Sequence, residues 1–251
     1  MLKLLCVTAH PDDEAGSFGG ALLLYRERGV ETYVVCLTPG QAATYRGNTR
    51  SEEDLAAQRR REFADSCRTL KVSSGEVLDY PDGALDRADF YGVVEDLVLR
   101  MRNIRPQIVM TFGPEGGLTA HPDHSMAGIF ATMAFHWARR ANRYVEQLRD
   151  GLQPHCAQKL YYSTAPFTLP DRQPVALAPE TTRIHIGDYL ETKIAAFKAH
   201  KSQAPLFDRF ENYVRKRGQE EVFHLVAVAA PSVIKPETDL LDGVHDYITI
   251  K

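Results

Sequence analysis

The chain has 251 residues, of which 44% are hydrophobic and 25% charged, values typical of a globular protein with one α/β domain. The net charge of −3 gives no reason to expect a nucleic acid or a membrane surface as a partner. No apolar run approaches the roughly 18 residues of a membrane span, and the apolar start is too short for a signal peptide. The four cysteines contain no Cys-x-x-Cys pair, which favours a reduced, cytoplasmic protein.

Strand-like and helix-like segments alternate through the first part of the chain. Short apolar or β-branched runs predict strands at residues 2–8, 32–38, 76–80 and 107–112. Amphipathic patterns predict helices after them, at residues 16–28, 52–70, 86–104 and 122–142. This alternation predicts an α/β fold, with a mostly parallel sheet and helices on both of its faces.

The second part of the chain is less regular. Strands are predicted at residues 160–164, 183–186 and 222–229, and a helix at residues 188–200. We predict a single domain over residues 1–251, with a metal-binding core at 1–145, while residues 146–251 complete the fold and supply substrate loops. The glycine-, proline- and polar-rich segments 44–51 and 153–180 are candidates for a substrate lid.

Two His-Pro-Asp motifs follow predicted strands. Residues 10–14 (HPDDE) follow the first strand, and residues 121–124 (HPDH) follow the loop after the fourth. Ligands of an open parallel sheet bind outside the carboxyl ends of its strands, where both motifs are expected. Imidazole and carboxylate together suit zinc and similar divalent ions. A catalytic metal site needs three protein ligands and an open position for water, and His10, Asp13 and His124 meet that need.

The remaining motif side chains suit acid–base chemistry. Asp12 adjoins a ligand in sequence but points elsewhere, so we expect it to take a proton from metal-activated water. His121 is predicted either to stabilise the oxyanion of a tetrahedral intermediate or to protonate the leaving amine. Asp123 is predicted to hold that imidazole in the required tautomer.

The segments AHPDDE (residues 9–14) and HPDH (residues 121–124) resemble the two marks of the PIG-L/LmbE-like deacetylase family. This family includes N-acetylglucosaminyl-phosphatidylinositol deacetylase and the deacetylases of mycothiol and bacillithiol biosynthesis. The resemblance implies a Rossmann-like fold and a zinc-dependent N-deacetylase, although the ligand set also accepts Fe²⁺ or another divalent ion. It implies that His10, Asp13 and His124 are the metal ligands and that Asp12 is the general base. It also implies that His121 supports the oxyanion or the leaving group, with Asp123 as its partner.

Further marks of the family imply substrate contacts. Arg59 and Glu62 resemble an Arg-x-x-Glu pair whose arginine helps to bind the sugar, and Asp82 resembles an aspartate that meets sugar hydroxyls. His200 lies in the segment 193–203, which resembles a Lys…His-x-Ser-Gln pattern, and is a third expected substrate contact. Each has a plainer alternative: a surface helix residue for Arg59, a turn residue for Asp82 and a helix cap for His200.

We therefore predict a metal-dependent hydrolase that removes the acetyl group from an N-acetylglucosamine-type substrate. One alternative is an amidase of the same family that cleaves a larger acyl group, in a thiol conjugate or a natural-product intermediate. Another is a non-catalytic metal- or sugar-binding protein, against which Asp12 argues. A non-haem iron oxygenase shares the ligand set but has no supporting cosubstrate motif. The resemblance further implies a small-molecule amino-sugar conjugate as partner and a homo-oligomer; the loop at residues 113–120 has its own sequence and leaves the rest of the substrate open.

Overall fold

The computed structural model describes residues 1–169, 175–217, 219–230, 233 and 235–246. Its strands form one sheet with the order β3-β2-β1-β4-β5-β7-β6. The strands are β1 (Lys3–Thr8), β2 (Glu31–Cys36), β3 (Ser74–Val77), β4 (Ile108–Phe112), β5 (Lys159–Thr164), β6 (Thr182–His185) and β7 (Glu220–Val228). Strands β1 to β5 run parallel, and β7 lies antiparallel to both β5 and β6, so the predicted mostly parallel sheet is confirmed.

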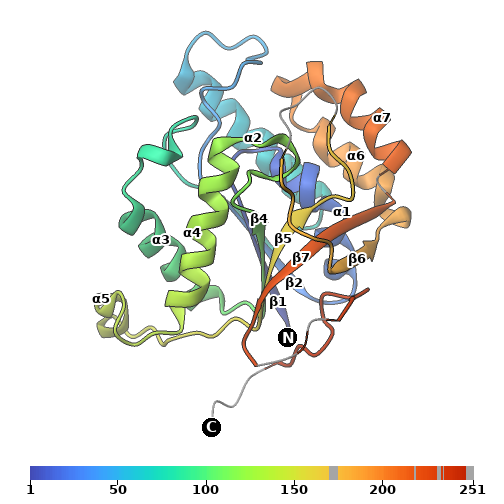
Figure 1. Cartoon of the computed structure of the whole chain (residues 1–251). Helices are drawn as coiled ribbons and strands as arrows, with labels where there is room; N and C mark the ends of the chain where they lie inside the picture. The colour runs from blue at the N-terminus through green and yellow to red at the C-terminus, as the bar shows by residue number, and fades with distance from the viewer. Residues whose placement is uncertain (170–174, 218, 231–232, 234, 247–251) are drawn as a thin grey trace.

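Helices cover both faces of this sheet, as the alternation predicted (Figure 1). One layer contains α1 (Asp13–Glu27), α2 (Glu52–Thr69) and α6 (Leu190–Lys198), and the other contains α3 (Phe90–Ile104) and α4 (Pro122–Ala138). Two hydrophobic cores result, one on each face of the sheet.

Strand β1 shows why both layers are needed. Leu4 and Cys6 belong to the core under α1, whereas Leu5 and Val7 belong to the core under α3 and α4. All four side chains are fully buried. Because successive side chains of a strand point to opposite faces, a continuously apolar strand requires cover on both sides.

Several boundaries differ from those predicted. Helix α1 begins at Asp13 rather than residue 16, because two acidic motif residues form its first turn, where the helix dipole favours negative charge. Helix α4 ends at Ala138 rather than residue 142. The helices α5 (Val145–Arg149) and α7 (Phe207–Arg217) were not predicted; α7 is mostly charged and buries little apolar surface.

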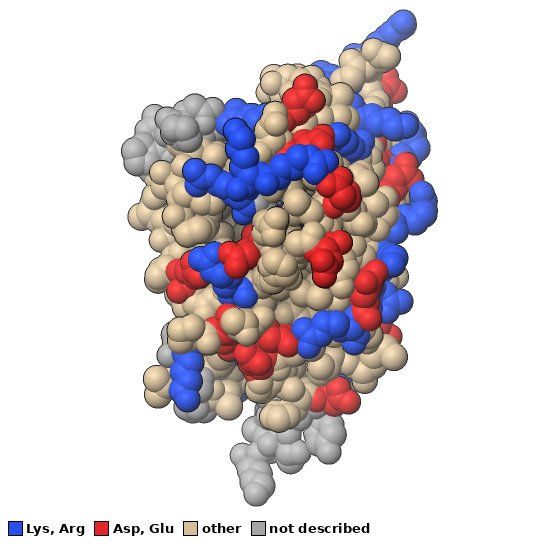
Figure 2. Space-filling model, turned by 90° about the vertical axis from the view of Figure 1, so that its right-hand side faces the viewer, with Lys and Arg blue, Asp and Glu red and all other residues tan. Residues whose placement is uncertain are grey.

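The outer surface carries charges of both signs. Figure 2 shows lysine and arginine side chains beside aspartate and glutamate side chains on the face formed by α6 and α7. Ion pairs there include Lys198–Glu211 and Arg215–Glu191. Among the described residues, no helix is both long and apolar enough to cross a membrane. Of the predicted lid segment 153–180, residues 170–174 lie outside the described part of the chain.

Candidate active site

Three histidines meet at the carboxyl ends of β1 and β4. His10 follows β1, while His121 caps the start of α4 and His124 lies in its first turn. The centroids of the three rings lie 4.7 to 5.2 Å apart. One ring nitrogen from each lies within 4.8 Å of the others, close enough to share a metal ion. His10 and His124 are buried, and His121 is the least buried of the three.

Asp13 contacts two of these histidines. Its Oδ1 lies 3.0 Å from His124 Nε2, and its Oδ2 lies 3.6 Å from His10 Nδ1. The backbone N–H groups of Ala9 and His10 donate to Oδ2, at 3.2 and 2.8 Å, which holds the carboxylate in place. Burial opposes its charge, but His124 and His10 keep the pKa of Asp13 well below its usual value. The structure thus brings together all three predicted metal ligands.

His124 is fixed by contacts on the far side of its ring. Its Nδ1 lies 3.3 Å from the Gly116 carbonyl oxygen and 3.3 Å from Thr119 Oγ1. Phe112 stacks on the imidazole with ring centroids 4.1 Å apart. An Nδ1–H that donates to a carbonyl leaves Nε2 with a free lone pair, and here Nε2 faces Asp13.

His10 is fixed in the same way, but by carboxylates. Its Nε2 lies 3.1 Å from Asp82 Oδ1 and 3.2 Å from Asp123 Oδ2, which leaves Nδ1 on the side of Asp13. Burial alone would lower the pKa of His10, but hydrogen bonds to Asp123 and Asp82 raise it to about 10. This arrangement is the carboxylate–histidine pairing that commonly orients metal-binding imidazoles.

The structure places two predicted site residues differently from the expectation. Asp82 was expected to meet the substrate, yet its side chain is 7% exposed and lies on His10. Asp123 was expected to orient His121 through its carboxylate. Instead, its backbone N–H donates to His121 Nδ1 at 3.1 Å, while the carboxylate accepts from the Gly83 backbone N–H at 2.6 Å and contacts His10. Asp123 is 1% exposed, so its carboxylate lies inside the fold.

Asp12 stands beside the ligand cluster in an unusual backbone conformation. Its φ of 115° lies in the left-handed region that non-glycine residues rarely adopt. Its carboxylate Oδ2 lies 2.9 Å from Arg59 Nη2, and the Asp12 side chain is 19% exposed. Burial raises the pKa of Asp12 to about 6, against the opposing attraction of Arg59. A carboxylate with a pKa in this range can both accept and return a proton near neutral pH.

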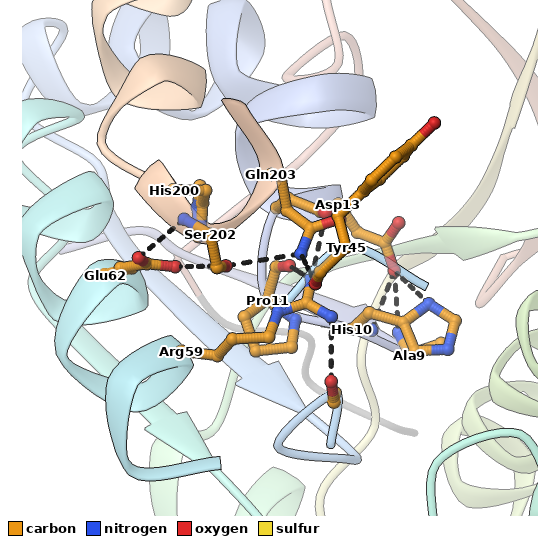
Figure 3. Close-up of polar contacts among 12 residues, drawn as sticks. Ala9, His10, Pro11, Asp13, Tyr45, Arg59, Glu62, His200, Ser202 and Gln203 are labelled. Atoms are coloured by element: carbon orange, nitrogen blue, oxygen red, sulfur yellow. Dashed lines mark hydrogen bonds and ion pairs between the residues drawn. The ribbon is translucent and has the colours of Figure 1, made fainter. Parts of the chain in front are cut away.

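Arg59 lies beneath the site rather than on the surface of α2. Its side chain is 3% exposed. The guanidinium donates to the carbonyl oxygens of Gly40, at 3.0 Å, and Pro11, and to the carboxylate of Asp12. Figure 3 shows Arg59 beside Pro11. A Cβ atom at residue 40 would lie 2.3 Å from Arg59 Nη1, so the glycine is required for this close approach. The placement ties Arg59 to Asp12, and direct contact with a sugar is not supported by its burial.

His200 is farther inside still. It has no exposed surface, and its Nε2 lies 2.7 Å from Glu14 Oε1. A side chain without exposed surface does not reach a bound sugar, so the predicted substrate contact is not supported by the structure. Glu14 was not assigned a role from the sequence, although it belongs to the HPDDE motif. The available signal was only its place in the motif, since the predicted helix began at residue 16, after Glu14.

The segment after His200 connects α2 with the predicted lid at residues 44–51. Glu62 accepts from the backbone N–H of Ser202, at 2.8 Å, and from its hydroxyl, at 2.6 Å. Gln203 Nε2 donates to the carbonyl oxygen of Tyr45 at 3.1 Å. Figure 3 shows these contacts running from Glu62 to Tyr45 beside the motif around His10.

Comparisons with known proteins place the chain in one family. Residues 5–135, which contain both motifs, match the family model described as PIG-L, GlcNAc-PI de-N-acetylase. The chain is 31% identical over 217 residues to diacetylchitobiose deacetylase of Thermococcus kodakarensis, covering 85% of this chain and 75% of that one. It is 29% identical to mycothiol S-conjugate amidase of Streptomyces coelicolor, covering 98% of each chain.

A solved structure resembles the fold as well. The N,N'-diacetylchitobiose deacetylase from Pyrococcus horikoshii superposes with a TM-score of 0.76 at 26% identity, covering 89% of this chain and 83% of that one. The α/β fold and the two motifs define a deacetylase-type hydrolase. The chain belongs to the PIG-L family, which confirms the predicted family.

Proposed function

We propose that the protein is a metal-dependent hydrolase that removes the acetyl group from an N-acetylglucosamine-type substrate. The observation that carries the proposal is the meeting of His10, Asp13 and His124 at one sheet edge, with Asp12 beside them. Each of the two histidines is hydrogen-bonded on its far side, which leaves one nitrogen of each for a metal ion.

Other donor sets at this edge are less suitable. The group formed by His10, Asp82 and Asp123 is already satisfied, since both carboxylates accept backbone N–H groups as well as the imidazole. In the group formed by His10, His121 and His124, the Nδ1 atom of His121 already accepts the Asp123 backbone N–H, and His121 is the least buried of the three. Two imidazoles and one carboxylate are a common catalytic zinc set, so we assign Zn²⁺, with Fe²⁺ as the other candidate.

A divalent ion held there would supply Lewis acidity, which lowers the pKa of water and polarises the acetyl carbonyl. Asp12 takes the proton from the attacking water. After the new C–O bond forms, Asp12 returns this proton to the amide nitrogen as the C–N bond breaks, releasing acetate and the free amine.

His121 serves as a hydrogen-bond donor rather than an acid in this scheme. Its Nδ1 accepts the backbone N–H of Asp123, so the ring proton resides on Nε2. Burial, together with His10 and His124, lowers the pKa of His121 and keeps the ring neutral at pH 7. A neutral imidazole donates to a developing oxyanion without losing its proton. Of the two roles predicted for His121, we therefore favour oxyanion stabilisation.

A second candidate function keeps the same chemistry with a larger acyl group. The 29% identity to a mycothiol S-conjugate amidase, over nearly the whole of both chains, favours it. We further propose that residues 1–251 act as one domain, with residues 1–145 carrying the metal and residues 146–251 completing the fold. Two features support a single domain: β5, β6 and β7 extend the same sheet, and His200 contacts Glu14.

The test is release of acetate and free amine from N,N'-diacetylchitobiose and N-acetylglucosamine. Metal-free protein is compared with protein reloaded with Zn²⁺ or Fe²⁺. We expect metal to restore release in the wild type and in His136→Ala, which removes a histidine from the last turn of α4. We expect no release from His124→Ala. Metal bound at one ion per chain without acetate release would refute the deacetylase proposal, and a panel of longer acyl groups would then test the amidase.

A further inference from the structure

The unusual backbone of Asp12 is held from several directions. Its backbone N–H donates to Glu14 Oε2 at 3.0 Å, and its carbonyl oxygen accepts from Gly16 N at 2.8 Å. Its carboxylate is held by Arg59. A non-glycine residue with φ of 115° persists only where its surroundings enforce that conformation. The contact with Glu14 is therefore part of what sets the direction of the Asp12 side chain.

Glu14 in turn depends on partners at its second oxygen. The side chain has no exposed surface. Its Oε1 accepts from Ser66 Oγ, at 2.6 Å, and from His200 Nε2, at 2.7 Å, while Oε2 faces Asp12. A buried carboxylate requires donors for both oxygens, so these partners determine which way the group is turned.

The His200 ring has one hydrogen-bond partner among the described residues. It lies after α6, 186 residues from Glu14 in the sequence, and is fully buried. Its Nδ1 has no hydrogen-bond partner in the described part of the chain. Neither ring nitrogen bonds the end of α6 or the 3-10 helix at Lys201–Leu206, so the described contacts do not support the helix-cap alternative. Glu14 is thus the one hydrogen-bond partner that the described residues offer to this ring.

We propose that His200 is a positioning residue for the hydrolytic reaction, acting through Glu14 to hold Asp12 in the orientation that its carboxylate needs. The inference rests on the proposed function, because it requires Asp12 to be the base. The segment that carries His200 is itself fixed, since Glu62 holds the neighbouring Ser202 through two hydrogen bonds.

The test compares two replacements of His200 in the full-length, zinc-loaded protein. His200→Leu removes the donor, whereas His200→Gln places an amide N–H near the former Nε2. With N,N'-diacetylchitobiose as substrate, we expect kcat of the leucine variant to fall about 10- to 100-fold, a range typical of residues that orient a catalytic group. KM and zinc content should stay near wild-type values, and the glutamine variant should recover most of the lost kcat.

Glu14→Gln is the second variant. If His200→Leu does not fold, an unchanged kcat in folded Glu14→Gln would still overturn the inference, because His200 acts only through Glu14. A glutamine has one oxygen, which cannot accept from both Asp12 and His200, so kcat should fall to a similar extent. The matched control is His155→Leu. His155 is also buried and donates to the Pro106 carbonyl oxygen at 2.6 Å, but it lies at the opposite end of β4. This control should lower the melting temperature and leave kcat unchanged.

Two further results would overturn the inference. One is a His200→Leu variant with kcat within twofold of wild type. The other is a folded, zinc-loaded His200→Gln variant that is no more active than His200→Leu. Asp12→Asn, measured in the same assay, separates this inference from the proposed function. Near-wild-type activity of Asp12→Asn would refute the base itself, whereas an inactive Asp12→Asn beside a fully active His200→Leu would refute only the role of His200.

Discussion

Two buried polar centres of this protein differ in how completely they are satisfied. The first surrounds Asp12 at the carboxyl edge of the sheet. The second surrounds Arg102 on α3, which is 1% exposed. The guanidinium of Arg102 makes five hydrogen bonds of 2.9 to 3.3 Å, to the main-chain oxygens of Ala138, Arg140, Arg143 and Tyr144 and to the side chain of Gln147.

The difference separates a structural centre from a functional one. At Arg102, all five N–H groups have acceptors, and the centre joins the end of α4 to α5. Around Asp12, the backbone is strained, and two buried nitrogens, Arg59 Nε and His200 Nδ1, have no partner in the described part of the chain. Strain and unmatched polar atoms are costs that a fold retains where the geometry serves chemistry.

The largest expected effect is on activity at the first centre. Asp12→Asn keeps the shape of the side chain but removes the base, so kcat should fall about 10²- to 10⁴-fold. The melting temperature should stay the same or rise, because asparagine adopts positive φ more readily than most residues. Steady-state kinetics and thermal unfolding measure the two effects. A marked loss of stability would instead place Asp12 with Arg102 as a structural residue.

The second centre should respond in the opposite way. Arg102→Met keeps much of the side-chain length but leaves buried carbonyl oxygens without donors, so the free energy of unfolding should fall by about 3 kcal/mol. Arg102→Lys retains the charge but has fewer donors, so its free energy of unfolding should lie between those of the wild type and Arg102→Met. Urea unfolding gives the stabilities. The kcat of the folded protein should not change, and a loss of kcat at full stability would remove the distinction between the centres.

Metal binding should stabilise the folded protein, and this effect should depend on the first centre and not on the second. An ion that binds the folded state raises the free energy of unfolding by about 2.7 kcal/mol at 100 times its dissociation constant. We expect zinc to raise the melting temperature of the wild type and of Arg102→Met, and a chelator to reverse this rise. His124→Ala should lack the rise. A zinc-dependent rise that persists in His124→Ala would place the ion elsewhere.

The pH dependence should follow Asp12. Burial raises its pKa to about 6, against the pull of Arg59, and the base is active only when deprotonated. The value of kcat/KM should therefore be constant above this pKa and fall about tenfold per pH unit below it. A bound cation should displace this falling part of the pH profile, its acid limb, to lower pH. Arg59→Met removes the favourable charge and should move the limb to higher pH. An unmoved limb would mean that another group titrates.

Much of the architecture follows from local patterns. The apolar runs and amphipathic repeats of residues 1–145 located β1 to β4 and α1 to α4, because strand and helix periods are written in neighbouring residues. Helix α7 was missed, since its sequence is mainly charged, and the antiparallel direction of β7 depends on a return of the chain that no local pattern records.

The candidate site divides in the same way. The sequence by itself determined that His10, Asp13 and His124 would meet, because parallel strands bring the loops at their carboxyl ends to one edge. Only the tertiary structure decided that Asp123 turns to His10 and that His200 lies buried on Glu14. Those partners are 113 and 186 residues apart, and such contacts depend on how whole elements pack rather than on any spacing within a motif.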